Sequence, residues 1–235
     1  MKSNEKIVAS LLIAVGIVIL GFCIKSGIDG FSSRDRVVTV RGLAEKEVKA
    51  NKVTWPIVCK TVGNDLNTIY NDIQKNKAAI LEYLKKNGVK DDEISVNAPQ
   101  VIDLQAERYI SNNIIYRYNV SQVIVVVSKN VDAIRELITN QSELLKQGVA
   151  IAASDYEYKV TYEFTDLNSI KPEMIANATK AAREAGNQFA EDSNSKLGKI
   201  KTATQGQFSI EDRDSNTPYI KNVRVVSYVE FYLED

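Results

Sequence analysis

The feature that most constrains the fold is the spacing of apolar residues, which changes from the two-residue period of strands to the helical period and back, twice. The first stretch predicts a strand at 52–62, a helix that begins at Asn64 or Asp65 and ends at Gly88, and strands at 93–104 and 114–128. The second predicts a strand at 155–165, a helix from about Ser169 to Asn194, and strands at 199–210 and 223–233.

These stretches predict two β-α-β-β units, with a further helix at 131–146 between them and a strand at 36–43 before them. Because antiparallel pairs follow each long helix, we expect an α+β fold with mixed, largely antiparallel sheets and helices packed on one face. The matching order of elements suggests a structural repeat, although the two halves share little residue identity.

Two residues of the strand at 52–62 carry specific expectations. Pro56 has no backbone N–H to donate, so this strand is predicted to be an edge strand or to contain a bulge at that point. Cys59 shares a strand face with Trp55 and Ile57, which predicts a small buried side chain rather than a redox group.

The N-terminal region contains an apolar segment, residues 7–24, of 18 residues without a charge. Lysines flank it at positions 2, 6 and 25, and its length is just sufficient for a membrane-spanning helix. Three interpretations are open: an uncleaved signal anchor, a cleaved signal peptide, and a lipoprotein signal with Cys23 acylated. The anchor is preferred because there is no clean A-x-A cleavage pattern and because Phe22 precedes Cys23, where a lipoprotein signal requires a small residue.

This interpretation divides the chain into a transmembrane helix at 1–25, a linker at 26–35 rich in Gly, Ser and charge, and an α+β domain at 36–235. With the N-terminal lysines retained inside, the domain is expected at the outer face of the cytoplasmic membrane, toward the periplasm or the outer surface.

The composition excludes several classes of function. The chain of 235 residues contains 30 Lys and Arg, 30 Asp and Glu, and no histidine. The missing histidine removes the Ser-His-Asp and Cys-His systems and all His-liganded metal sites, and the balanced charge argues against nucleic acid as a partner. No P-loop, dinucleotide-binding or nucleophile-elbow motif occurs. We therefore predict no catalytic, cofactor-binding or metal residues, no cofactor, and no enzymatic activity.

Three groups of residues are candidates for a binding or catalytic site. The loop at 211–216 contains three carboxylates, which suggests calcium, but it lacks the ligand spacing of a calcium loop and is better explained as a solvated hairpin end. The acids at 91–93 and the pair Glu107 and Arg108 are interpreted as solvated turns. The tyrosines are explained either by sheet packing or by a subunit interface: Tyr109, Tyr116, Tyr118, Tyr156, Tyr158 and Tyr162.

Three further stretches resemble the SIMPL family of bacterial periplasmic or surface-exposed domains. They are VVTVRGLAEKEVKANKV (Val37 to Val53), LKKNGVKDDEISV (Leu84 to Val96) and ATKAAREAGNQFAEDSNSKLGKI (Ala178 to Ile200). The resemblance covers about residues 36–234, and it departs from many relatives at Asn51 and Lys52, where they have a Pro-Asp pair. It implies a non-enzymatic envelope protein with a role in stress resistance, and it carries over no catalytic residue.

The function expected from the sequence is therefore that of a membrane-anchored, extracytoplasmic domain that acts by protein assembly or binding in the cell envelope. Its expected partners are the membrane, through the N-terminal helix, further copies of itself in a homo-oligomer, and envelope proteins. The alternative from another class is a histidine-free cell-surface enzyme that uses carboxylates and tyrosines.

Overall fold

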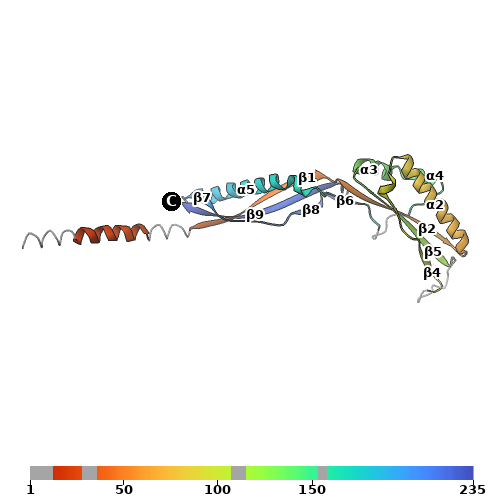
Figure 1. Ribbon diagram of the computed structural model, residues 1–235, viewed down its shortest axis with the longest axis horizontal. Helices are drawn as coiled ribbons and strands as arrows, with labels where there is room; N and C mark the ends of the chain where they lie inside the picture. Colours follow the sequence, from red (N-terminus) through yellow and green to blue (C-terminus); the bar gives the residue numbers. More distant parts are fainter. Residues whose placement is uncertain (1–12, 28–35, 107–114, 153–157, 235) are drawn as a thin grey trace, which may run out of the picture. The chain divides into compact units, whose positions relative to one another are not determined.

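The computed structural model describes residues 13–27, 36–106, 115–152 and 158–234 (Figure 1). The chain divides into two compact units, each built from separate stretches of sequence. Unit 1 takes residues from 1–46, 168–209 and 223–235, and unit 2 takes residues from 47–167 and 210–222. The range 36–235, presented by the sequence as one α+β domain, thus contributes to both units.

The elements follow one another in an order that is close to the expected one. They are β1 (Val37–Lys49), β2 (Lys52–Gly63), α2 (Leu66–Lys86), the short 3₁₀ helix η2 (Asp91–Glu93), β3 (Ile94–Val96), β4 (Gln100–Asp103), β5 (Tyr118–Ser128), α3 (Val131–Thr139), α4 (Ser142–Lys146), β6 (Thr161–Glu163), α5 (Leu167–Asp192), β7 (Lys196–Gln205), β8 (Ser209–Asp212) and β9 (Ile220–Glu234). The α+β class with antiparallel sheets is confirmed.

Sheet B has the strand order β3-β5-β2-β6, with β4 also paired to β5. The pairing of β2 with β5 runs without interruption from Val53 opposite Ser128 to Gly63 opposite Tyr118. One face of the sheet packs against α2, α3 and α4, and the core between them includes Trp55, Ile57, Ile124, Leu84, Leu137 and Leu144. The alternation of apolar residues in β2 therefore indicates which face of the sheet the helices cover.

Both ends of α2 are determined by nearby residues that the sequence had indicated. Asp65, rather than Asn64, caps the helix by accepting a hydrogen bond from the backbone N–H of Thr68 at 2.8 Å. At the other end Gly88 has a φ of 85°, and the backbone N–H of Val89 donates to the carbonyl of Leu84 at 3.0 Å. This is the hydrogen-bond pattern of a Schellman motif, which requires a left-handed residue at this position.

Sheet A has the strand order β1-β9-β7, with β8 also paired to β9. Figure 1 shows α5 running along this sheet. The side of α5 that is buried carries small residues, including Ala178, Ala182 and Gly186. Gly42 of β1 lies beneath them so closely that a Cβ atom there would overlap the backbone carbonyl of Ala178. The spaced alanines thus allow close contact between helix and strand, as their size predicted.

The suggested repeat is present in the order of elements, but the strand pairing differs from the expected one. The strand predicted at 155–165 is described only at Thr161–Glu163, and it pairs with β2 at the edge of sheet B. In sheet A, β9 is flanked by β1 on one side and by β7 and β8 on the other. In sheet A the strand beside β9 is therefore β1, and the strand at 161–163 does not join that sheet.

Three predicted elements are interrupted in the structure. The helix at 131–146 divides into α3 and α4 because polar Gln141 falls where the apolar stripe requires a buried residue. The strand at 93–104 divides into β3 and β4 at Pro99, which cannot donate to a ladder. The strand at 199–210 divides after Gln205, and the helix expected from Ser169 begins two residues earlier, at Leu167.

The prediction for Pro56 is wrong in both forms, because β2 lies between β5 and β6 and is therefore not an edge strand. The register of β2 against β5 continues through Pro56 opposite Val125, so there is no bulge at this point. The carbonyl of Val58 accepts a hydrogen bond from Ala152 on the side away from β5. Pro56 lies two residues away, so its nitrogen faces that same side, beyond the three residues where β6 pairs. The proline therefore lies between the described partners of β2 on this side, Thr161 opposite Thr54 and Ile151 opposite Cys59.

At the N-terminus, residues 13–27 are helical, whereas residues 1–12 and 28–35 lie outside the described part of the chain. Within the residues that the structure describes, no helix is both long enough and apolar enough to cross a membrane. The transmembrane helix predicted at 7–24 is therefore not shown.

Candidate interaction surface

One face of sheet A is exposed to solvent. Along β1 and β9 the side chains alternate between buried residues, such as Val40 and Val229, and exposed ones. The buried set faces α5, so the exposed set lies on the opposite face of the sheet. It includes two large apolar side chains, Leu43 and Tyr228, which are 43% and 41% exposed. One face of an antiparallel sheet can be solvated, so these two apolar side chains, rather than the exposure itself, make this face a candidate for contact.

A groove of about 400 Å³ lies on this face. Its lining comes from three places in the sequence: Arg41 and Leu43 of β1, Gln207 and Ser209 near the break between β7 and β8, and Arg224, Val226 and Tyr228 of β9. At the break the backbone of Gly206 approaches β9 closely, since a Cβ atom there would come within 2.7 Å of the Val226 carbonyl oxygen. The groove therefore combines an apolar floor with two guanidinium groups.

The two arginines of the groove have different surroundings. The Nε of Arg224 lies 3.4 Å from a carboxylate oxygen of Glu45, and both side chains are about half exposed. The guanidinium carbon of Arg41 lies 5.1 Å from the centre of the Tyr228 ring, a cation–π contact. Among the described residues no carboxylate lies within ion-pair distance of Arg41. The groove thus has one cation that is paired and one whose charge is not neutralised.

The outer edge of β1 is a second unsatisfied feature of this surface. The backbone N–H of Leu233 donates to Arg36 O, and that of Ala50 donates to Tyr219 O, both at 2.9 Å. These bonds place the even-numbered residues of β1 toward β9, which lies next to it. In an antiparallel ladder the odd-numbered residues then direct their N–H and C=O groups away from the sheet. No strand in the described part of the chain pairs with this edge, so it is able to accept another strand.

Unit 2 contains a smaller hollow of about 300 Å³ near the beginning of α3. Its polar groups serve local structure: Asn130 caps α3 by accepting from the N–H of Ala133, and Asn51 accepts from the N–H of Thr165 at 2.9 Å. The side-chain oxygen of Asn51 therefore links the connection between β1 and β2 to Thr165.

Arg135 and Tyr219 form a stacked pair at the same end of unit 2. The guanidinium carbon of Arg135 lies 3.3 Å from the centre of the Tyr219 ring, and Tyr162 meets that ring edge-on, with centroids 6.2 Å apart. Burial raises the pKa of the Tyr162 hydroxyl. These tyrosines pack against the core of sheet B, as one of the two interpretations of the sequence expected.

The remaining tyrosines do not gather on one surface among the described residues. Tyr116 is 47% exposed, whereas Tyr118 is partly buried and contacts Arg117 at 4.9 Å from its ring centre. Tyr109 and Tyr156 lie outside the described residues. Tyr228, which sequence reasoning did not single out, is the tyrosine of the groove.

Cys59 is buried, with 3% of its surface exposed, and it belongs to the core of sheet B. Burial raises the pKa of its thiol to about 11, so the reactive thiolate is scarce at neutral pH. The expected burial of Cys59 among the core residues of its strand face is confirmed. Cys23, in contrast, is exposed.

Two of the three acidic residues in the loop at 211–216, Asp212 and Asp214, have partners within the protein. Asp214 accepts hydrogen bonds from the backbone N–H groups of Asn216 and Thr217, both at 2.8 Å, and from Arg213 at 3.1 Å. The Thr217 hydroxyl also donates to it, and these donors lower the pKa of the carboxyl to about 2. Asp212 pairs with Lys221. The loop therefore has the organisation of a hairpin end, and its carboxylates do not converge.

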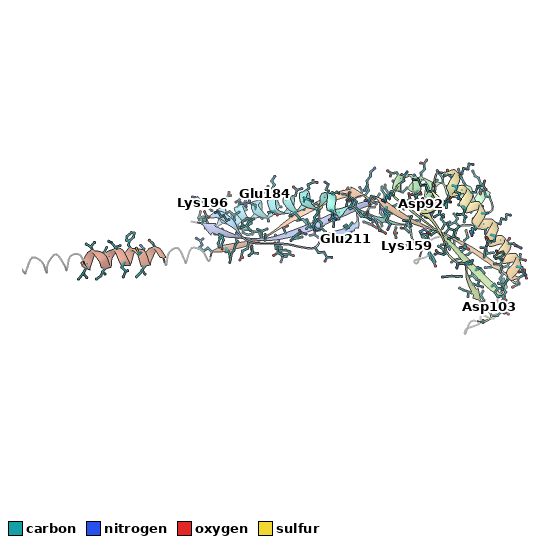
Figure 2. The ribbon with its side chains drawn as sticks, viewed as in Figure 1. Asp92, Asp103, Lys159, Glu184, Lys196 and Glu211 are labelled. Carbon is teal, nitrogen blue, oxygen red and sulfur yellow. The ribbon has the colours of Figure 1, made fainter. Side chains whose placement is uncertain are left out.

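The acidic residues at 91–93, also named from the sequence, interact with residues close to them in the chain. Glu93 accepts from the backbone N–H of Lys90 at 3.0 Å, and Asp91 pairs with Lys85 at 2.7 Å. Glu107 and Arg108 lie outside the described residues. Figure 2 shows Asp92, Asp103, Glu184 and Glu211 on separate elements. Within the described residues, no group of three or more His, Cys, Asp or Glu side chains could hold a metal ion.

Sequence reasoning missed Arg41, Leu43, Arg224 and Tyr228 as a surface. The alternation along 37–45 showed that Arg41 and Leu43 share a strand face. It could not show that this face lies beside β9, because the pairing of β1 with β9 joins the two ends of the sequence.

The fold and the surface together define an α+β protein with an antiparallel sheet that is open on one face and along one edge. The chain belongs to the SIMPL family, described as "Protein of unknown function (DUF541)", whose sequence model matches residues 38–227. This match confirms the resemblance noted in the sequence. A search of curated proteins gave no match.

Proposed function

We propose that this protein acts by protein assembly or binding in the cell envelope, through the open face and free edge of sheet A. The observation that carries this proposal is the exposure of Leu43 and Tyr228 beside the unpaired edge of β1. An edge strand exposes backbone donors and acceptors, and proteins either protect such edges or use them for pairing. The exposed apolar residues on the adjoining face favour use over protection.

The groove supports binding better than catalysis. The proposed alternative, a histidine-free enzyme, requires carboxylates and tyrosines that converge in a pocket. Among the described lining residues of the groove there are two arginines and one tyrosine, but no carboxylate. A surface of this composition can hold a partner in place, whereas it lacks a group to accept a proton from a substrate.

The proposal includes a membrane anchor over residues 7–24, with the domain outside the cytoplasm and a role in envelope stress resistance. Support comes from the uncharged sequence and its flanking lysines. Helix 13–27 also exposes its apolar side chains: Ile13, Val15, Ile17, Val18, Ile19, Leu20, Phe22 and Ile24. Side chains of this kind require an apolar environment such as a bilayer.

The test of assembly is the mass of the full-length chain in detergent, measured by light scattering and by sedimentation at micromolar concentration. We expect a defined homo-oligomer. The substitution Leu43→Asp places a charge on the open face and is expected to lower the oligomeric mass. Leu145→Asp is the matched control, because Leu145 is 60% exposed on α4 in unit 2.

A wild-type chain that remains monomeric at these concentrations would contradict the assembly proposal. Turnover of a cell-surface substrate by that monomer would then support the enzyme. If both leucine variants keep the wild-type mass, assembly occurs through a surface other than the open face of sheet A.

A further inference from the structure

The free edge of β1 has a residue pattern that is complementary to itself. We infer that β1 pairs with β1 of a second copy, antiparallel, around a two-fold axis that passes through Leu43. This inference rests on the proposed function, because it names the partner and the register of the same surface. Its support comes from backbone direction, charge and side-chain size.

Backbone direction determines which groups can pair. The outward-facing N–H and C=O groups of β1 belong to odd-numbered residues, as the bonds from β9 to Arg36 and from Ala50 to Tyr219 require. A two-fold axis that pairs these groups passes either through a hydrogen-bonded pair, centred on an odd-numbered residue, or through a non-hydrogen-bonded pair, centred on an even-numbered one. In the exposed middle of the strand the available centres are residues 39–45.

Charge selects one of these centres. An axis at Arg41 places two guanidinium groups opposite each other, and an axis at Glu45 does the same with two carboxylates. An axis at Thr39 leaves Arg41 opposite Val37, and axes at Val40 and Gly42 leave it opposite Thr39 and Leu43. An axis at Ala44 places Arg41 opposite Glu47, which already pairs with Arg213, and leaves Leu43 opposite the Glu45 carboxylate. An axis at Leu43 places Arg41 of each copy opposite Glu45 of the other, twice, with the two Leu43 side chains in contact at the centre.

The second copy also supplies an opposite charge to Arg41, which has no carboxylate partner among the described residues of the single chain. Arg41 has its ring contact with Tyr228 but no carboxylate among the described residues. Glu45 already contacts Arg224 at 3.4 Å, and both are about half exposed, so it can accept a second guanidinium. An acidic peptide would neutralise Arg41 but would have to supply a cation at the correct spacing for Glu45. A second β1 supplies both a carboxylate for Arg41 and a guanidinium for Glu45, because it has the same sequence.

The other face of β1 offers no obstacle to this pairing. In the register centred on Leu43, Gly42 of one copy lies opposite Ala44 of the other. Both residues are small and already buried beneath α5. The two strands can therefore approach to the normal spacing without a side-chain clash at these positions.

The first test reverses charges in the full-length protein. Arg41→Glu and Glu45→Arg each place like charges opposite each other, and we expect each variant to lose at least tenfold in apparent association constant by sedimentation. Mixing the two variants restores both attractive pairs, and the double variant restores them within one sequence. Lys180→Glu, on the exposed side of α5, is the charge-reversal control and should leave association unchanged.

The second test detects the register directly. In a Cys23→Ser background, Leu43→Cys should form a disulfide-linked dimer under mild oxidation, since opposed residues of such a pair lie about 5.5 Å apart between Cα atoms. Thr39→Cys should not, because its two copies would be eight residues apart along the strands, or about 27 Å. Cys59 is too buried to interfere.

The outcomes separate this inference from the proposal on which it rests. An oligomer that persists without the Leu43→Cys crosslink, and that is insensitive to both charge reversals, overturns the β1 pairing but retains assembly. A monomeric wild-type chain overturns both. Rescue of association by mixing the two charge variants supports the pairing, because a general loss of folding cannot be repaired by a second defective chain.

Discussion

A single missing side chain determines how closely helix and sheet approach in unit 1. Gly42 occupies a position on the buried face of β1 where any Cβ atom would overlap the backbone of α5 at Ala178 and Ala182. Backbone atoms cannot rotate aside as a flexible side chain does, so the helix itself would have to move. The glycine is required by contact, since its φ is not in the left-handed region.

We therefore predict that Gly42→Ala lowers the free energy of unfolding by about 3 kcal/mol or more, as expected for overpacking against rigid backbone. The measurement is urea denaturation followed by circular dichroism. Thr39→Ala, on the exposed face of the same strand, is the control and should change stability by less than about 0.5 kcal/mol. Equal stability of the two variants would show that α5 can shift at no cost.

At the scale of elements, the sequence predicted those strands and helices that obey one period from end to end. The alternation in β2 and the stripe of α2 are of this kind, and both were placed within one or two residues. Prediction failed where a tertiary contact decides. β6 pairs with β2 in sheet B, and the alternation that includes Tyr158 and Tyr162 carries no information about which sheet this strand joins.

The hairpin end between β8 and β9 shows how an acidic loop is stabilised from within. Hydrogen bonds from Thr217 and Arg213 lower the pKa of Asp214 from 3.8 to about 2 in the folded protein. Because the folded pKa is the lower one, the carboxylate stabilises the loop above about pH 4. That contribution is lost as the pH falls toward 2.

We predict that the backbone amide signals of Asn216 and Thr217 shift in NMR spectra with a titration midpoint near pH 2. Asp214→Asn should abolish this titration, since an amide does not ionise in this range, while the strands β8 and β9 remain formed. A midpoint near pH 4 in the wild-type protein would mean that the loop donors do not bind the carboxylate in solution.

At the scale of the whole molecule, the sequence predicted the α+β class and the family but not the composition of the two units. Unit 1 draws β1 from the beginning of the domain and β9 from its end, a pairing that no local period can reveal. The candidate surface depends on that pairing, because Arg41 meets Tyr228 only across it. Its residues were therefore visible in the sequence one by one, but not as a surface.

The proposed membrane anchor at residues 7–24 also concerns the whole molecule. We predict that residues 7–24 are retained in the mature protein, and that the intact mass of protein extracted from membranes equals that of the full chain. The physical reason is the absence of small residues where a signal peptidase or a lipoprotein signal requires them, with Phe22 before Cys23. A mass that lacks residues 1–22 or more contradicts the anchor, and a diacylglycerol on Cys23 would identify a lipoprotein.

The position of β9 between β1 and β7 also has a consequence for biogenesis. β1 is among the first parts of the domain to leave the ribosome, yet its partner in sheet A is the last strand to be made. Contacts of such long sequence separation form slowly, because a large loop must close before they are gained. β1 therefore has no partner strand in sheet A until residues 220–234 have been made. A nascent chain that stalls before residue 220 cannot complete unit 1.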